Sequence, residues 1–178
     1  MASISTCPAT CCSRLANGQL PQATTSPQIR PLRSLRYSSH QRTHIMTTLL
    51  ARLRVHPGKE ADFERTVRPL WAATHQLEPA CRRYEYWRGQ EPGVYYCLLS
   101  FDDFVGFMTH QTSPHHEAPD FPALLAEINL EYLDPVGGAS DLAPTNPQPM
   151  PEGASELMQT YARNHAFALP DWWNRMRG

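Results

Sequence analysis

Three histidines close together are the sequence's clearest candidates for acid–base chemistry. His110, His115 and His116 lie in the stretch HQTSPHH. The imidazole is the side chain whose ordinary pKa lies nearest to neutral pH, so it can take up and release a proton there. We therefore expect His110 and His115 to be the candidate general bases, and we expect His116 to point elsewhere and be solvated. Two plainer roles stay open, because His115 can simply cap the following helix and His110 can be half exposed on a short helix.

A metal site is another interpretation of the same stretch. His110, His115 and Glu117 offer two imidazoles and a carboxylate, which are zinc ligands, but their spacing matches no known zinc motif and we predict no metal. The three cysteines of the N-terminal segment have no histidine partners. The two cysteines of the body, Cys81 and Cys97, are expected to be small core residues on strands.

The elements that must position these side chains follow from hydrophobic periodicity. Residues 47–56 alternate between apolar and polar side chains, which predicts a half-buried strand. Residues 59–74 place apolar side chains on one helical stripe, and Pro69 is expected to kink or locally unwind this helix. Residues 81–88 and 94–101 alternate on either side of a turn, which predicts a hairpin.

Two short helices and a last strand complete the body. A helix over residues 104–111 can be capped by Asp102 or Asp103, and a second helix is expected over 121–128, before a strand over 129–136. The order β-α-β-β-α-β predicts an α+β fold of the ferredoxin-like split βαβ type. Helices would cover one face of its sheet and leave the other open, and a second copy of the chain is the commonest cover for such a face.

The segments outside this body have different compositions. Residues 1–45 show no periodicity and contain five arginines but no acidic residue, so we predict a disordered leader that is either transit-like or the product of an over-extended gene start. The protein is then organellar (plastid or mitochondrion) in the first case and cytoplasmic from Met46 in the second. Residues 137–154 are expected to be a proline-rich linker, and 155–178 a helical arm whose two adjacent tryptophans dock on the body.

Composition and charge exclude two classes of partner. The chain has 178 residues, 41% of them hydrophobic, and no apolar run long enough for a transmembrane helix, so no membrane partner is expected. Its formal net charge of −1 is the sum of +5 before Met46 and −6 after it. An acidic body argues against nucleic-acid binding, which needs a basic surface.

Three segments in the right order resemble the antibiotic biosynthesis monooxygenase (ABM) family. They are LLARLRVHPGKEADF at 49–63, EPACRRYE at 78–85 and HQTSPH at 110–115. The similarity covers residues 47–136. It implies a dimeric α+β barrel, in which two sheets pack face to face and each subunit holds a site between its sheet and its helices. The family's characterised members include cofactor-free oxygenases of quinols and anthrones, haem-degrading proteins and an isomerase branch.

Applied to this chain, the resemblance implies a monooxygenase that needs no cofactor and uses O₂ on a small aromatic substrate. Such an enzyme needs a base, a group that holds an oxyanion and a dry aromatic pocket. His115 and His110 are the expected bases and Arg52 the expected oxyanion partner. The residues expected to wall the pocket are Trp71, Tyr84, Tyr86, Phe104 and Phe107.

Several of these assignments have a structural alternative. Trp71 lies on the helical stripe and can be a core residue, with His75 on the same face, and Tyr84 and Tyr86 can be buried at a dimer interface. A haem-degrading role is weakened because the first strand has no Asn. Two other functions remain open for the whole chain: a non-catalytic dimeric barrel that binds a small hydrophobic ligand, and an isomerase.

Overall fold

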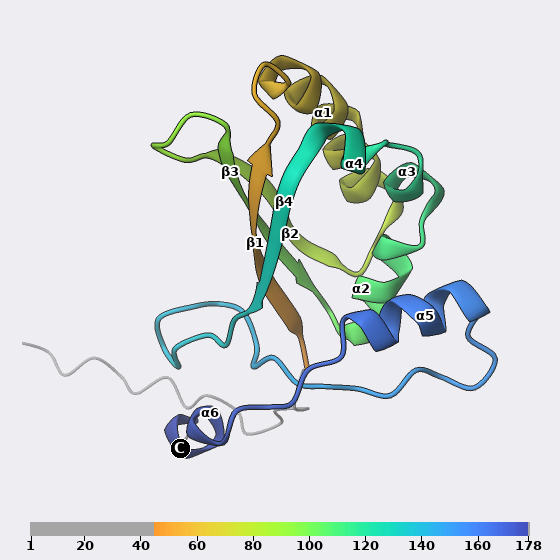
Figure 1. Ribbon diagram of the computed structural model, residues 1–178. Coiled ribbons are helices and arrows are strands. Elements are labelled where there is room, and N and C mark those ends of the chain that lie inside the picture. Colours follow the sequence, from red (N-terminus) through yellow and green to blue (C-terminus); the bar gives the residue numbers. More distant parts are fainter. Residues whose placement is uncertain (1–44, 178) are drawn as a thin grey trace, which may run out of the picture. The chain divides into compact units, whose positions relative to one another are not determined.

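A computed structural model describes residues 45–177, and its core is a four-stranded antiparallel sheet. The strands are β1 (Thr47–Val55), β2 (Cys81–Arg88), β3 (Val94–Phe101) and β4 (Leu125–Tyr132), in the order β2-β3-β1-β4. The helices α1 to α4 lie on one face of this sheet (Figure 1). This is the ferredoxin-like α+β arrangement that the sequence predicts. The predicted leader lies outside the described residues.

Side chains of β1 alternate between a buried and a partly exposed face of the sheet. Leu49, Ala51 and Leu53 are buried on the helix side, while Leu50 and Arg52 are partly exposed on the other side. β1 pairs along its length with β3 and with β4, so it is one of the two inner strands of the sheet.

α1 (Glu60–Leu77) covers the sheet with one apolar face. Phe63, Val67 and Leu70 are buried on that face, at helical spacing. The helix is continuous through Pro69, so the expected local unwinding does not occur. A proline interrupts a single hydrogen bond of the ladder, and the packing of the apolar face on the sheet compensates for it.

The segment after the hairpin holds three short helices, α2 (Phe104–Gln111), α3 (Pro114–Glu117) and α4 (Phe121–Leu124). Asp103 caps α2, accepting a hydrogen bond from the Gly106 amide at 2.7 Å. The helix predicted over 121–128 ends at Leu124, so that prediction is wrong for its second half. Leu125 already pairs with Val55 of β1, because the backbone hydrogen bonds of an open sheet edge outweigh the local helical pattern.

The C-terminal segment packs against the body. α5 (Glu156–Asn164) is capped by Ser155, whose hydroxyl accepts from the Met158 amide. It lies along α2 (Figure 1). In α6 (Asp171–Met176), Trp173 is only 8% exposed while Trp172 is 59% exposed, so one of the two tryptophans docks.

The segment between β4 and α5, which was predicted to be a linker, is held to the body by hydrogen bonds. Thr145 is fully buried, and its hydroxyl bonds to the Leu133 carbonyl and the Thr48 amide. Arg177 at the end of the arm bonds to Asp134 and to the Thr145 carbonyl. Within residues 45–177, no helix has the length and apolar character needed to cross a membrane.

Candidate active site

His110 is the most deeply buried titratable side chain of the predicted site. α2 turns it toward the sheet, where its ring contacts Tyr84 edge-on at 4.6 Å and Phe101 at 5.1 Å between centroids. Its side chain is 0% exposed, and its Nδ1 lies 3.0 Å from a carboxylate oxygen of Glu78. A neutral His110 therefore carries its proton on Nδ1 and leaves Nε2 free to accept one.

Glu78 joins two of the three histidines. It is the residue at which α1 ends, and its buried carboxylate also lies 2.5 Å from Nε2 of His115. Burial opposes the charge of this carboxylate, but the hydrogen bonds and positive charge of His110 and His115 outweigh burial and lower its pKa. Glu78 is thus an ionised acceptor between two imidazoles, and His115 connects it to the surface, since the His115 side chain is 18% exposed.

His116 is the residue whose position differs most from the prediction. It was expected to be solvated, but burial lowers the pKa of its imidazole to about 3, and its ring contacts that of His110 at 4.7 Å. The expectation of a solvated His116 is therefore wrong. Nε2 of His110 and Nδ1 of His116 are both buried, and neither has a hydrogen-bond partner among residues 45–177. Buried polar atoms without a partner are rare in folded proteins and call for a reason.

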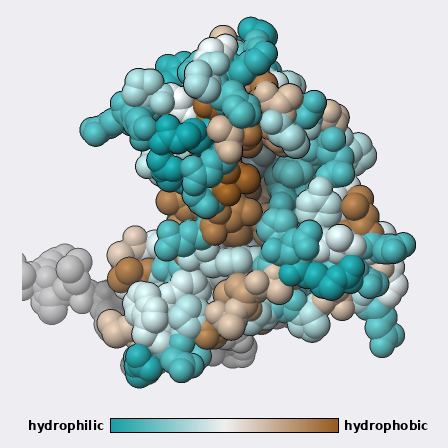
Figure 2. Space-filling model, in the orientation of Figure 1, coloured by the Kyte–Doolittle hydropathy of each residue, from teal (hydrophilic) through white to brown (hydrophobic). Residues whose placement is uncertain are grey.

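A pocket of about 470 Å³ lies beside these rings, between the sheet and the helices. Its size is within the range of about 300–1,000 Å³ that is usual for small-molecule sites. The sheet contributes apolar side chains and two tyrosines, and the helices contribute apolar and polar ones. The residues that line it include Leu53, Tyr84, Tyr86, Phe107, Gln111 and His116. Figure 2 shows the apolar side chains gathered in a hollow that hydrophilic residues surround.

The two tyrosines supply the pocket's sheet-side polar groups. Their hydroxyl oxygens are 2.7 Å apart, so one donates to the other. Burial is the main reason why the pKa of each phenol is raised well above its ordinary value. Both tyrosines therefore stay protonated at neutral pH and can act as hydrogen-bond donors.

Only part of the predicted set meets at this pocket. Tyr84, Tyr86 and Phe107 line it, whereas His110 and His115 lie behind its wall. Arg52 does not reach it, because it projects from the opposite face of the sheet, where it lies 3.7 Å from Glu91.

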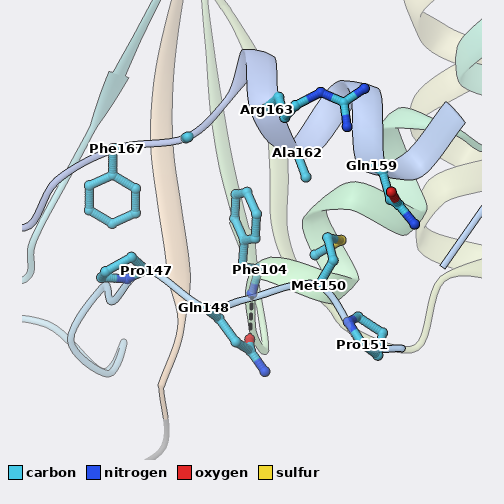
Figure 3. Close-up of a pocket in the computed structure, with 10 residues that line it drawn as sticks. Phe104, Pro147, Gln148, Met150, Pro151, Gln159, Ala162, Arg163 and Phe167 are labelled. Atoms are coloured by element: carbon cyan, nitrogen blue, oxygen red, sulfur yellow. Dashed lines mark hydrogen bonds between the residues drawn. The ribbon is translucent and has the colours of Figure 1, made fainter. Parts of the chain in front are cut away.

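Trp71 and Phe104 also lie elsewhere. Trp71 is 45% exposed on the outer side of α1, where its ring contacts His75, so it is neither a core residue nor a pocket residue. Phe104 lines a second cavity, of about 490 Å³, between α2, α5 and the proline-rich segment (Figure 3).

A metal ion is the other group that this site could hold. Donor atoms of Glu78, His110 and His115 all lie within 4.8 Å of one another. Two ligands of one tetrahedral zinc ion are roughly 3.3 Å apart, given metal–ligand bonds of about 2.0 Å. The contact of 2.5 Å between His115 and Glu78 is instead that of a hydrogen bond. Glu117, the carboxylate expected from the sequence, accepts a hydrogen bond from Tyr161 and is not in this group.

Sequence reasoning missed two residues, Glu78 and His116. Glu78 stands in one of the segments that resemble the ABM family, but it is 32 residues from His110 and no spacing rule joins them. His116 was expected to point away from its neighbour His115 and be solvated, and α3, with four residues, is too short for its periodicity to show which side faces the pocket. A carboxylate at the end of a helix that precedes a strand was the only available signal for Glu78.

The fold and site define a class of protein: a ferredoxin-like α+β chain with a ligand-sized pocket under its sheet and a buried carboxylate–imidazole cluster beside it. Residues 46–118 match the family model described as antibiotic biosynthesis monooxygenase. A protein of Caulobacter crescentus CB15 named after the same activity is 30% identical, and the match covers 53% of this chain and 92% of that one (TM-score 0.49). The chain belongs to the antibiotic biosynthesis monooxygenase family.

Two other solved structures are similar to the body. A Bacteroides thetaiotaomicron VPI-5482 protein is 15% identical over 53% of this chain and 92% of its own length (TM-score 0.50). A Pseudomonas aeruginosa protein is 23% identical over 51% of this chain and 94% of its own (TM-score 0.47). No curated protein matches the chain significantly.

Proposed function

We propose that this protein is a cofactor-independent monooxygenase that oxidises a small, flat, electron-rich phenol, such as a quinol or an anthrone, with O₂. The observation that carries the proposal is the position of His116. Its neutral imidazole lines the apolar pocket and also contacts the buried His110, which bonds to Glu78. A base inside a dry pocket, connected to a buried carboxylate, is what the activation of such a phenol requires.

The proton of the substrate leaves first. His116 lines the pocket, so its imidazole can accept the phenolic or activated C–H proton of a bound ligand. Because burial lowers the pKa of this imidazole to about 3, His116 cannot keep the proton and must pass it on, as a relay. Within the described part of the chain, Nε2 of His110 has no hydrogen-bond partner, and the His110 ring contacts that of His116, so this nitrogen is the natural next acceptor. Glu78 then stabilises the positive charge on His110, as the carboxylate of a serine-protease triad stabilises its imidazolium.

The pocket then holds the anion. Tyr84 and Tyr86 stay protonated, and a hydroxyl not used in their mutual bond can donate to the substrate oxyanion. The two tyrosines take the oxyanion-binding role that was expected of Arg52, because they line the pocket and Arg52 does not.

The oxidation needs no reductant from outside. The electron-rich anion passes electrons to O₂, and an anthrone CH₂ becomes a carbonyl group. One oxygen atom stays in that carbonyl and the other leaves as water together with the two hydrogens, so the substrate itself supplies all four electrons.

The test is oxygen uptake with a panel of quinols and anthrones, followed by mass spectrometry of the products formed under ¹⁸O₂. The wild-type protein should consume O₂ faster than the uncatalysed reaction, and an anthrone product should carry one ¹⁸O atom. His116→Gln should lower kcat by about 100-fold or more, the usual loss when a general base is removed. The matched control is His56→Gln, which changes an exposed histidine and should leave the rate unaltered.

Three results would contradict the proposal. Ligand binding without O₂ uptake across the panel would leave the non-catalytic barrel as the function, and conversion of a substrate without O₂ would indicate an isomerase. A rate that a chelator abolishes and one divalent metal restores would instead make Glu78, His110 and His115 metal ligands.

A further inference from the structure

Two residues of the C-terminal arm lie in the wall of the pocket. Tyr161 and His165, from the end of α5, line it together with the sheet residues. Their rings are stacked, with centroids 6.0 Å apart and planes 13° from parallel. The His165 ring also meets Phe107 edge-on at 5.3 Å. The arm therefore supplies an aromatic surface on the helix side of the pocket.

The polar atoms of these two residues hold the arm in place. Nδ1 of His165 donates to the Tyr161 carbonyl at 2.8 Å, which leaves Nε2 to accept from the Gln111 amide at 3.0 Å. The Tyr161 hydroxyl donates to Glu117 of α3, and the Tyr132 hydroxyl of β4 donates to the His165 carbonyl. The arm is thus tied to α2, α3 and β4, and mainly ring surface remains for a ligand.

The boundary that β4 forms is less closed. Ile128 and Leu130 of β4 line the pocket and are 55% and 38% exposed. A ligand can extend past these two side chains, whereas the fixed rings of Tyr161 and His165 limit it at α5. The match to the family model ends at residue 118, so the arm lies outside the part of the chain that matches the family.

We infer that Tyr161 and His165 are specificity-determining residues, which restrict the pocket to flat aromatic ligands of limited size. The inference deepens the proposed function, since it concerns the same pocket, but it depends only on binding and not on oxidation. It predicts that the arm selects among planar phenols by the number of their fused rings, because a stacked pair of rings held by hydrogen bonds cannot move aside without losing them.

The experiment measures dissociation constants of the full-length protein for three fluorescent planar phenols: 2-naphthol, 9-phenanthrol and 1-hydroxypyrene. The quantity compared is the Kd for 1-hydroxypyrene divided by that for 2-naphthol. Tyr161→Ala and His165→Ala should lower this ratio at least about five-fold, because removing a ring makes room for the larger ligand and removes a contact from the smaller one. Leu157→Ala, an exposed position on the same helix, is the matched control and should not change it.

A conservative variant separates lost stability from lost selectivity. Tyr161→Phe removes the bond to Glu117 but keeps the ring, so it should preserve the wild-type ratio even if the protein melts at a lower temperature. An unchanged ratio in both alanine variants, or no binding of any of the three phenols to the wild type, would overturn the inference. Selective binding without O₂ uptake would support this inference and contradict the proposed oxygenase function.

Discussion

Replacing Glu78 with Gln is the sharpest test of the buried cluster, because the change keeps the shape of the side chain and removes its charge. The carboxylate accepts hydrogen bonds from His110 at 3.0 Å and from His115 at 2.5 Å. An amide has one acceptor oxygen, so its NH₂ group must face one of the two histidines and at least one bond is lost. A hydrogen bond to a charged group contributes about 1.5–3 kcal/mol, and we expect the free energy of unfolding to fall by that amount.

The assays are urea unfolding and thermal unfolding at pH 7. For a body of this size, each kcal/mol corresponds to roughly 4 °C, so the melting temperature should fall by roughly 6–12 °C. Glu152→Gln, which changes an exposed carboxylate, is the control and should melt like the wild type.

The pH dependence of the free energy of unfolding gives an independent check, because the direction of the Glu78 pKa shift fixes the direction of the change. The two histidines lower the pKa of Glu78 in the folded protein below its ordinary value of 4.5. This group therefore stabilises the fold fully above pH 4.5, and the stabilisation is lost as the pH falls through the lower folded value. The difference between wild type and Glu78→Gln should be constant near neutrality and shrink in that acidic window. A variant that melts within about 1 °C of the wild type, or a difference that grows on acidification, would refute the reasoning.

Two further predictions concern the open sheet face and His116. Leu50 and Leu98 are paired neighbours on the sheet face that is expected to bind a second copy of the chain. Leu50→Lys should therefore turn a dimer into a monomer in light scattering, whereas Ala72→Lys, at an exposed position of α1, should not. A wild-type protein that is already a monomer would refute the expected dimer. Burial lowers the pKa of His116 from 6.5 to about 3, so this residue stabilises the fold above pH 6.5 and the stabilisation declines between pH 6.5 and 3. His116→Gln should reduce that decline in urea unfolding, and identical pH profiles would show that His116 is not buried in solution.

The strands and the first helix were predictable because each has a strong local pattern. In β1 the alternation is strict, and in α1 the apolar residues from Phe63 to Leu70 recur at helical spacing. At Leu125, by contrast, a helical sequence pattern continues into a strand. Pairing with Val55 across the sheet decides that residue's conformation, and a single-sequence pattern does not contain it.

The sequence by itself determined the ferredoxin-like order of elements and the family, and it singled out His110, His115 and the tyrosines of β2 as residues that can do chemistry. Only the tertiary structure decided which of these side chains meet. It joined Glu78 to His110, placed the partly buried His116 beside the pocket and placed Arg52 on the far face of the sheet. The physical reason is that a local pattern assigns a side chain to one face of a helix or strand, whereas burial and hydrogen-bond partners depend on segments far apart in the chain.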